Sequence, residues 1–263
     1  MSPKPHPNRP VTPGAVIIAG IALIAGASQA AAENSAISNA VSHPDRTEAD
    51  VARDSGRNPA AVLEFFNAAP GDKVIEMGAG GGYYTELLSR TVGDSGYVYS
   101  YNPFFFLRFV SDEMKERYQD GALGNVTVLL GSLQPLGLPS DNLDAAYFIN
   151  TYHDAYFTED SGEAQSQRAV ASLREIHRML KPGGIVAIVD HRASSGMSRS
   201  AAAGLHRIPE EILKQDFLNA GFQFIAESDV LKNSSDERSK PWFGDPVLKD
   251  ATDRLVMKFR KPE

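Results

Sequence analysis

The chain has 263 residues, of which 42% are hydrophobic and 22% charged, a composition that excludes a disordered protein and suits one large globular domain or two small ones. It carries 26 Lys and Arg against 33 Asp and Glu, so nucleic acid is not an expected partner, because an acidic surface repels phosphate backbones. Without cysteine it has no disulfide, no thiolate metal site and no cysteine nucleophile.

Residues 1–32 are predicted to be a secretory signal peptide. Two basic residues precede an apolar run over residues 15–25, and small residues follow that suit cleavage after Ala30 or Ala32. An uncleaved N-terminal anchor is the alternative, because the run and its alanine tail reach about 18 residues. Cleavage would leave 24 basic residues against 33 acidic ones, a net charge of −9, and no later segment long enough to span a bilayer. We therefore expect an exported, periplasmic protein.

The remaining residues divide into a short leader and one domain. Residues 33–42 are small and polar and predict a flexible leader, and residues 43–263 are predicted to form a single domain. The apolar runs of this domain predict strands at 73–77, 96–102, 125–131, 143–150, 185–191, 222–231 and 253–261. Helical spacing and end signals predict helices at 60–68, 83–91, 104–119, 162–184 and 209–221.

Strands and helices alternate five times at short spacing, which predicts a parallel sheet with helices on both faces. The last two strands break this alternation. The segment between them, residues 232–252, is too long for a hairpin turn and is expected to be functional, as a lid that carries Trp242.

The first strand leads into the glycine-rich stretch "EMGAGGGY" from Glu76 to Tyr83. In such a sheet this turn contacts the ligand. A phosphate-binding loop is excluded because no Lys followed by Ser or Thr ends it, and a dinucleotide fingerprint lacks its third glycine, where Tyr83 stands. The pattern that remains is an acidic residue followed by alternate glycines.

This pattern resembles the first motif of the class I, S-adenosylmethionine-dependent methyltransferases. More narrowly, "HPDR" at 43–46, "HDAY" at 153–156 and "KFRKP" at 258–262 resemble a group of exported bacterial methyltransferases, and "LKPGG" at 180–184 supports the family. The resemblance spans about residues 40–263. It implies a three-layer, Rossmann-like α/β fold whose seven-stranded, mostly parallel sheet has the order 3-2-1-4-5-7-6, with helices on both faces.

The cofactor that the resemblance implies is S-adenosyl-L-methionine, whose carboxylate suits backbone N–H groups at a helix start. Asn102 and Ser132 stand where the family usually has acidic residues for the ribose and the adenine, so weaker cofactor binding is expected. The expected cofactor-binding residues are Glu76, Gly78, Ala79, Gly80, Gly82, Asn102, Ser132, Leu133 and Asn150.

Methyl transfer requires alignment of the reactants and sometimes a base. His153, Asp154 and His191 follow the fourth and fifth strands and are the expected catalytic residues, with His153 a base of near-neutral pKa. No metal site is expected, because the histidines lack a short spacing such as H-x-x-x-H. The expected substrate-pocket residues are His43, Arg46, Tyr83, Tyr84, Tyr152, His206 and Trp242.

The sequence thus predicts an enzyme that methylates a small molecule with S-adenosylmethionine. Two alternatives remain open. The first is a non-catalytic protein that binds S-adenosylmethionine or another nucleoside, which the neutral residues Asn102 and Ser132 would suit. The second is an NAD-dependent oxidoreductase, which Tyr83 and the two C-terminal strands disfavour.

Overall fold

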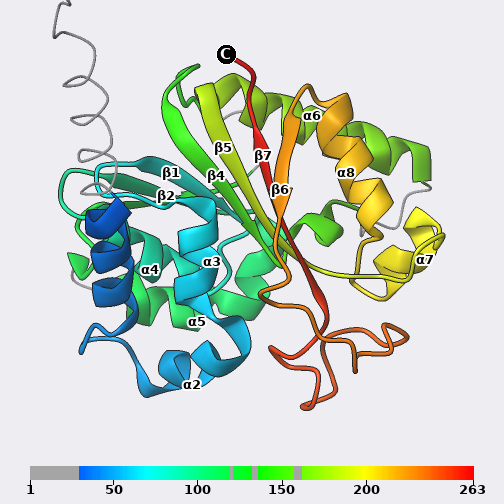
Figure 1. Cartoon of the computed structure of the whole chain (residues 1–263), viewed down its shortest axis with the longest axis horizontal. Coiled ribbons are helices and arrows are strands. Elements are labelled where there is room, and N and C mark those ends of the chain that lie inside the picture. The colour runs from blue at the N-terminus through cyan, green and yellow to red at the C-terminus, as the bar shows by residue number, and fades with distance from the viewer. Residues whose placement is uncertain (1–29, 119–120, 132–135, 157–161) are drawn as a thin grey trace, which may run out of the picture.

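The computed structural model describes residues 30–118, 121–131, 136–156 and 162–263. Its centre is a seven-stranded sheet of order β3-β2-β1-β4-β5-β7-β6 (Figure 1), which confirms the predicted topology. Only β7 runs antiparallel to its neighbours β5 and β6. The strands are β1 Lys73–Met77, β2 Tyr97–Asn102, β3 Val126–Leu130, β4 Leu143–Ile149, β5 Leu180–His191, β6 Gln223–Glu227 and β7 Arg254–Arg260.

Helices cover both faces of the sheet, as the alternating pattern predicted. The helices are α2 Glu48–Arg57, α3 Pro59–Phe66, α4 Tyr83–Val92, α5 Leu107–Tyr118, α6 Gly162–Met179, α7 Arg199–Gly204 and α8 Glu210–Asn219. One apolar cluster joins α3 and α4 to the sheet through Leu63 and Leu88, and a second joins α6 and α8 to the opposite face through Ile176 and Phe217. Strands buried on both faces explain the continuous apolar runs of the sequence.

The expected flexible leader is wrong for the described residues, because residues 30–41 form a helix (dark blue in Figure 1). Ile37 and Ala40 are buried, and Ile37 packs in the same cluster as Val62 and Leu63. Ile37, Ala40 and Val41 lie three and four residues apart, the spacing of one helical face. That short apolar face, rather than the polar composition, decides the structure of this segment. Residues 1–29 lie outside the described residues.

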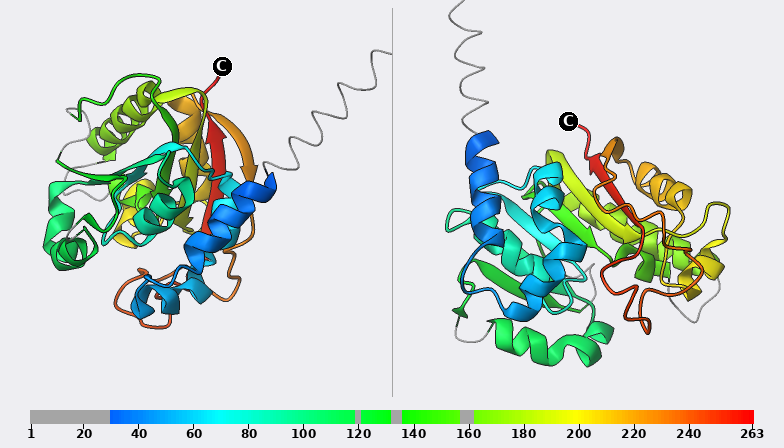
Figure 2. Two further views of the ribbon diagram at one scale, coloured as in Figure 1. Left: turned by 90° about the vertical axis from the view of Figure 1, so that its left-hand side faces the viewer. Right: turned by 60° about the horizontal axis from the view of Figure 1, so that its bottom comes forward.

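The carboxyl ends of the parallel strands meet at one edge of the sheet. Helix α2 and the segment between β6 and β7 lie beside this edge, at the bottom of Figure 1 and brought forward on the right of Figure 2. Ligands of open α/β sheets bind at this edge. The fold therefore places the glycine turn after β1, the loop after β4 and the end of β5 in the right region for a shared site.

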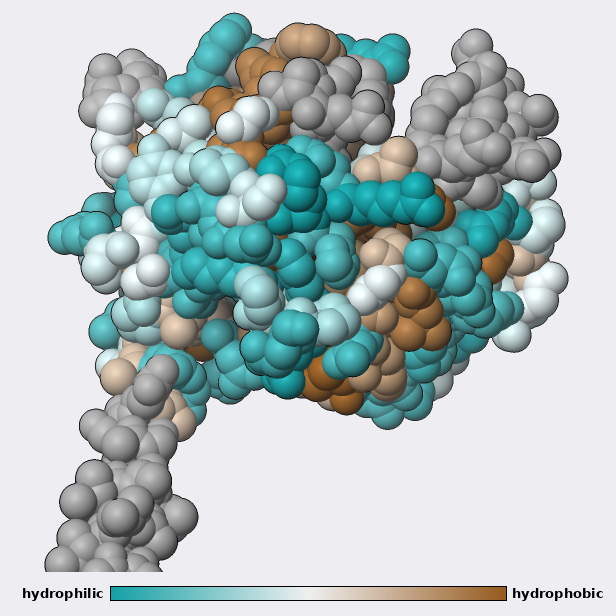
Figure 3. Space-filling view, turned by 90° about the horizontal axis from the view of Figure 1, so that it is seen from above, coloured by the Kyte–Doolittle hydropathy of each residue, from teal (hydrophilic) through white to brown (hydrophobic). Residues whose placement is uncertain are grey.

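The opposite edge is different in character. Seen from above in Figure 3, it is covered mainly by hydrophilic residues. Two ion pairs occur there, Lys181 with Asp144 at 2.5 Å and Lys261 with Asp141 at 2.6 Å. Among the described residues, none of the helices combines the length and the apolarity needed to cross a bilayer.

Candidate active site

The turn between β1 and α4 depends on its glycines. Gly78, Gly80 and Gly82 have φ angles of 67°, 59° and 88°, left-handed values that cost an L-residue roughly 1–2 kcal/mol. A Cβ atom at Gly78 would lie 2.9 Å from Cγ2 of Thr151, so this glycine lets the loops after β1 and β4 pack together. A Cβ atom at Gly80 would have nothing within 4 Å. Bare backbone therefore faces open space at Gly80.

Asn102, at the end of β2, holds this part of the turn in place. Its side chain is fully buried; Oδ1 accepts a hydrogen bond from the Gly80 N–H at 2.9 Å, and Nδ2 donates to the Gly80 carbonyl at 3.1 Å. Nδ2 also donates to Sδ of Met114 at 3.4 Å. Both amide protons are used, so a ribose hydroxyl could only donate to the remaining lone pair of Oδ1. Asn102 was expected to hydrogen-bond the ribose of the cofactor, and its side chain could do so only as an acceptor.

Asn150 follows β4, the strand beside β1, at the same edge of the sheet. Its backbone has a φ of 57°, and its N–H donates to the carbonyl of Val189 at 2.7 Å. Its side-chain Oδ1 is buried and has no hydrogen-bond partner among the described residues. Leaving such an acceptor unsatisfied costs about 1–3 kcal/mol. A hydrogen-bond donor from a ligand or from water would satisfy this oxygen, which fits the cofactor-binding role predicted for Asn150.

Glu76 lies one residue before the end of β1, and its side chain is buried. Burial raises the pKa of Glu76 to about 7, against the opposing effects of the Thr85 hydrogen bond and the charges of Arg57 and Arg117. Thr85 donates a short hydrogen bond to Glu76 and lies 3.2 Å from Oγ of Ser100. One carboxylate oxygen is thus committed to the first turn of α4. A direct contact of Glu76 with the cofactor stays a prediction.

Of the remaining predicted cofactor-binding residues, Ala79 is described by the structure and Ser132 and Leu133 are not. The N–H of Ala79 donates to the carbonyl of Tyr101 at 3.0 Å and ties the turn to β2. Gly80, Asn102 and Asn150 are therefore the residues whose geometry can be tested against a bound nucleoside. The open face of Gly80 and the unpaired oxygen of Asn150 fit one.

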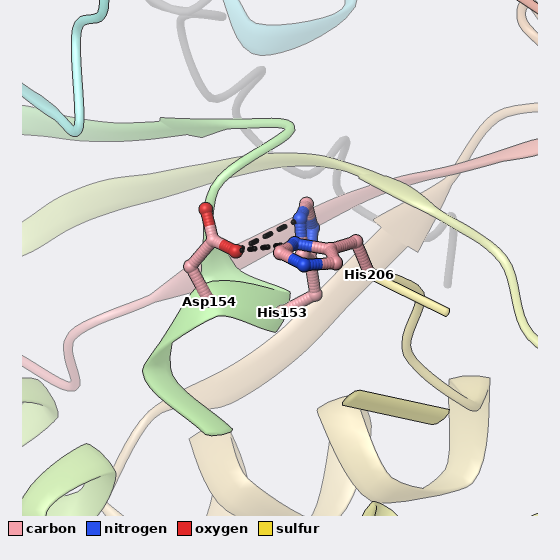
Figure 4. A group of neighbouring side chains, drawn as sticks. All are labelled: His153, Asp154 and His206. Carbon is pink, nitrogen blue, oxygen red and sulfur yellow. Dashed lines mark hydrogen bonds and ion pairs between the residues drawn. The ribbon is translucent and has the colours of Figure 1, made fainter. Parts of the chain in front are cut away.

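A second group of polar residues lies where the loop after β4 meets the loop after α7. His153 and Asp154 belong to the short 3-10 helix Tyr152–Tyr156, and Figure 4 shows both His153 and His206 approaching one carboxylate of Asp154. Nδ1 of His206 lies 2.9 Å from Oδ1 of Asp154, and Nε2 of His153 lies 3.3 Å from the same oxygen. On the other side, Nδ1 of His153 lies 2.6 Å from Oδ1 of Asp190 at the end of β5.

These charges set the protonation of the histidines. Burial alone lowers the pKa of His153, but the carboxylates of Asp190 and Asp154 outweigh it and raise this pKa to about 10. The near-neutral pKa expected for His153 is therefore not supported, because the two carboxylates favour its charged form. Burial is the main cause that lowers the pKa of His191, and the positive charges of His153 and Arg254 lower it further. This pKa is therefore well below its ordinary value.

Trp242 covers this group from the segment between β6 and β7. Its ring stacks on His191 with centroids 5.4 Å apart and planes at 13°. The indole Nε1 is buried and has no hydrogen-bond partner among the described residues. The neighbouring Phe243 meets Trp242 and His206 edge-on, at 5.6 and 4.9 Å between ring centroids. The long segment thus lies over the histidines, as expected of a covering loop.

The seven predicted pocket residues do not come together. His206 and Trp242 belong to the histidine group, but Tyr152 packs in the core under α8, where its hydroxyl lies 3.0 Å from Asp216. Arg46 is buried in a two-hydrogen-bond ion pair with Asp54, at 2.7 Å for each bond. These contacts assign Arg46 and Tyr152 to the stability of the fold.

The other three predicted pocket residues lie near α2. The Tyr83 hydroxyl donates to Asp54 at 2.5 Å, and the Tyr84 hydroxyl lies 3.4 Å from the carbonyl of Arg57. His43 lies before α2, where its Nδ1 accepts from the N–H of Asp45 at 3.2 Å. Tyr83 and Tyr84 therefore hold helix α2 against the carboxyl edge of the sheet.

Arg57, which connects α2 to the segment between β6 and β7, was not identified from the sequence. Nε of Arg57 lies 2.6 Å from Oδ1 of Asp250, and its guanidinium lies 4.6 Å from the centroid of the Tyr83 ring. The two partners are 193 positions apart. No local pattern of the sequence could have indicated this pair, which joins α2 to the covering segment.

A groove of about 970 Å³ lies beside α2, α4 and α5. Its lining includes Asp50, Glu86, Arg90 and Arg117, and none of the predicted cofactor residues contributes to it. These charged side chains form ion pairs with one another: Arg117 lies 2.6 Å from Asp50, and Arg90 lies 2.8 Å from Glu86. We therefore do not place the cofactor in this groove, because the sheet edge supplies the unpaired groups.

Part of the chain is similar to known methyltransferases. Residues 75–188 match a family model described as "Methyltransferase domain". A ubiquinone/menaquinone biosynthesis C-methyltransferase UbiE from Vibrio campbellii is 28% identical over 134 residues, which cover 49% of this chain and 45% of that protein. A protein-L-isoaspartate O-methyltransferase from Ignicoccus hospitalis is 33% identical over 72 residues, covering 27% and 33%. The match thus spans less than half the length of these curated relatives.

Solved structures share the fold at low identity. An S-adenosylmethionine-dependent methyltransferase from Aquifex aeolicus superimposes with a TM-score of 0.54 at 20% identity, over 77% of this chain and 89% of that one. A second from Mesorhizobium loti has the same TM-score at 15% identity, over 80% and 100%. The [4+2]-cyclase SpnF also gives 0.54, at 19% identity, over 79% and 81%. The fold is therefore shown, and it also occurs in a protein named as a cyclase.

Proposed function

We propose that this protein transfers a methyl group from S-adenosylmethionine to a small molecule, because residues 75–188 match a family model described as "Methyltransferase domain" and the fold is shared with S-adenosylmethionine-dependent methyltransferases. The proposal rests on the open backbone at Gly80 together with Oδ1 of Asn150, which has no hydrogen-bond partner among the described residues. Both lie at the carboxyl edge of the sheet, where a nucleoside is expected.

The chain would hold the cofactor through three groups. The backbone of Gly80 leaves room for the ligand, Oδ1 of Asn102 has one acceptor site left for a ribose hydroxyl, and Oδ1 of Asn150 accepts from the amine. When bound, the cofactor supplies an electrophilic methyl group on its sulfonium. The work of the protein is to align this group with the acceptor and to exclude water.

We assign the acceptor to the side of the histidine group. Trp242 and Phe243 offer an aromatic wall there, and the unpaired Nε1 of Trp242 offers a hydrogen-bond donor. His153, Asp154 and His191, the expected catalytic residues, lie next to this wall. A flat or apolar molecule with an oxygen that accepts a hydrogen bond suits this combination.

We further propose that the acceptor meets the protein outside the cytoplasm. The support is the pattern of residues 1–32, in which basic residues precede an apolar run and small residues follow it. The cofactor would then have to reach the same compartment.

Titration calorimetry on the purified chain tests the cofactor assignment. We expect heat from S-adenosylmethionine and from its demethylated product, and none from NAD. Binding of NAD with no response to S-adenosylmethionine would contradict the proposal. Binding of S-adenosylmethionine without turnover of any supplied acceptor would favour the non-catalytic alternative.

A further inference from the structure

His153, Asp154 and His206 offer three ligand atoms that converge on one point. These atoms all lie within 4.8 Å of one another. Figure 4 shows the two imidazoles approaching the same carboxylate from the 3-10 helix after β4 and from the loop after α7. The residue types are two nitrogen donors and one oxygen donor, a set that first-row transition metals accept.

The spacing suits a common metal ion. Bonds of about 2.1 Å at tetrahedral or octahedral angles place neighbouring ligand atoms roughly 3–3.4 Å apart. In the protein, Nδ1 of His206 and Nε2 of His153 lie 2.9 and 3.3 Å from Oδ1 of Asp154. Only small movements of these side chains would be needed to share an ion.

An independent observation concerns the orientation of His153. The side chain is 1% exposed. Its Nε2 faces Oδ1 of Asp154 at 3.3 Å, without the geometry of a hydrogen bond to any described residue. Nδ1 is held by Oδ1 of Asp190 at 2.6 Å. Asp190 is itself held by the N–H groups of His153 and His191, at 2.9 and 2.7 Å. A carboxylate behind a metal-binding imidazole fixes the ring and directs its second nitrogen at the metal.

We propose that His153, Asp154 and His206 bind a divalent transition-metal ion of the Zn²⁺ class, with Asp190 as the positioning residue behind His153. Mg²⁺ and Ca²⁺ are disfavoured because they prefer oxygen ligands. Three protein ligands leave at least one coordination position for water or for an oxygen of a substrate. This site goes beyond the proposed methyl transfer and does not depend on it.

The test is metal binding by the full chain, purified without a histidine tag and stripped with a chelator. Co²⁺ serves as the probe, because its visible absorption reports nitrogen and oxygen ligands, and competition with Zn²⁺ gives the affinity. We expect one Zn²⁺ per chain for the natural protein and about tenfold or more weaker binding for His206→Ala. His206 is only partly buried, so this variant is expected to fold. His177→Ala, on α6 away from the cluster, should bind like the natural protein.

A second variant tests the positioning role. Asp190→Asn should weaken Zn²⁺ binding about 10–100-fold, the usual effect of removing such a support, and circular dichroism would check its fold. Equal Zn²⁺ binding by the natural chain and His206→Ala would overturn the proposal, as it would show adventitious binding elsewhere. So would the absence of binding by the folded natural chain at a large excess of Zn²⁺. Neither result depends on whether S-adenosylmethionine binds.

Discussion

Oδ1 of Asp190, near the end of β5, lies 2.6 Å from Nδ1 of His153, in the 3-10 helix after β4, although the two residues are 37 positions apart. The other oxygen of Asp190 accepts the backbone N–H of His153 at 2.9 Å. Asp190 therefore fixes both the main chain and the ring of His153. The end of β5 thus determines the conformation of the loop after β4, and the site at this edge is one connected unit.

The glycine turn can be tested by adding one methyl group. Gly80→Ala should lose about 1–2 kcal/mol of stability because φ is positive, and its methyl should enter the space expected to hold the cofactor. We expect calorimetry to show affinity for S-adenosylmethionine reduced by about tenfold or more. Gly93→Ala is the matched control, because Gly93 also has a positive φ and free space but caps the far end of α4. Equal losses of affinity in the two variants would count against the assignment.

The unpaired acceptor of Asn150 gives a second test of cofactor binding. Asn150→Ala should weaken S-adenosylmethionine binding by about 1.5–3 kcal/mol, the value of a hydrogen bond to a charged amine. Asn58→Ala controls for the left-handed backbone, because Asn58 has a φ of 39° and makes no side-chain capping bond. Unchanged affinity in Asn150→Ala would mean that the amine lies elsewhere.

The buried ion pair between Arg207 and Asp236 anchors the covering segment. Their side chains are 0% and 2% exposed and lie 2.8 Å apart. Asp236→Ala should lower the free energy of unfolding by about 3–5 kcal/mol, because it leaves Arg207 buried without its partner. Thermal unfolding measures this loss. Asp229→Ala, which breaks the exposed pair with Lys232, should change stability by less than about 1 kcal/mol, and a similar loss in both would refute the anchoring role.

The raised pKa of Glu76 predicts a pH dependence of stability. The pKa of this carboxyl is about 7 in the folded chain against 4.5 for an unperturbed Glu, so the folded state holds the proton more tightly. Stability should therefore fall as pH rises from about 4.5 to 7 and change no further from this source above that. Glu76→Gln should remove this decline, worth a few kcal/mol at most. Denaturant unfolding at several pH values measures it, with exposed Glu116→Gln as the control; parallel profiles for Glu76→Gln and the natural protein would disprove it.

Export can be checked separately. If residues 1–32 are a signal peptide, exported material should begin after Ala30 or Ala32. Intact-mass spectrometry of the periplasmic fraction gives the first residue. Material that begins at Met1 would rule out cleavage and favour the anchor.

Local patterns in the sequence were enough for most of the strands. Strand β1 was predicted at its observed bounds, and α8 was placed correctly because Pro209 precedes it and Gly221 follows it. Errors arose where tertiary contacts compete with local preference. Leu180 was expected in the helix predicted at 162–184, but it begins β5 and pairs with Leu143 of β4.

The sequence by itself determined the glycine turn, the alternation of strands and helices, and the polar residues that follow β4 and β5, because backbone freedom and apolar spacing are local properties. Only the tertiary structure decided which of those residues meet. His206 lies 2.9 Å from Asp154 across 52 positions, and Arg57 meets Asp250 across 193. Such pairs depend on how the loops cross the sheet edge, and no spacing along the chain encodes that crossing.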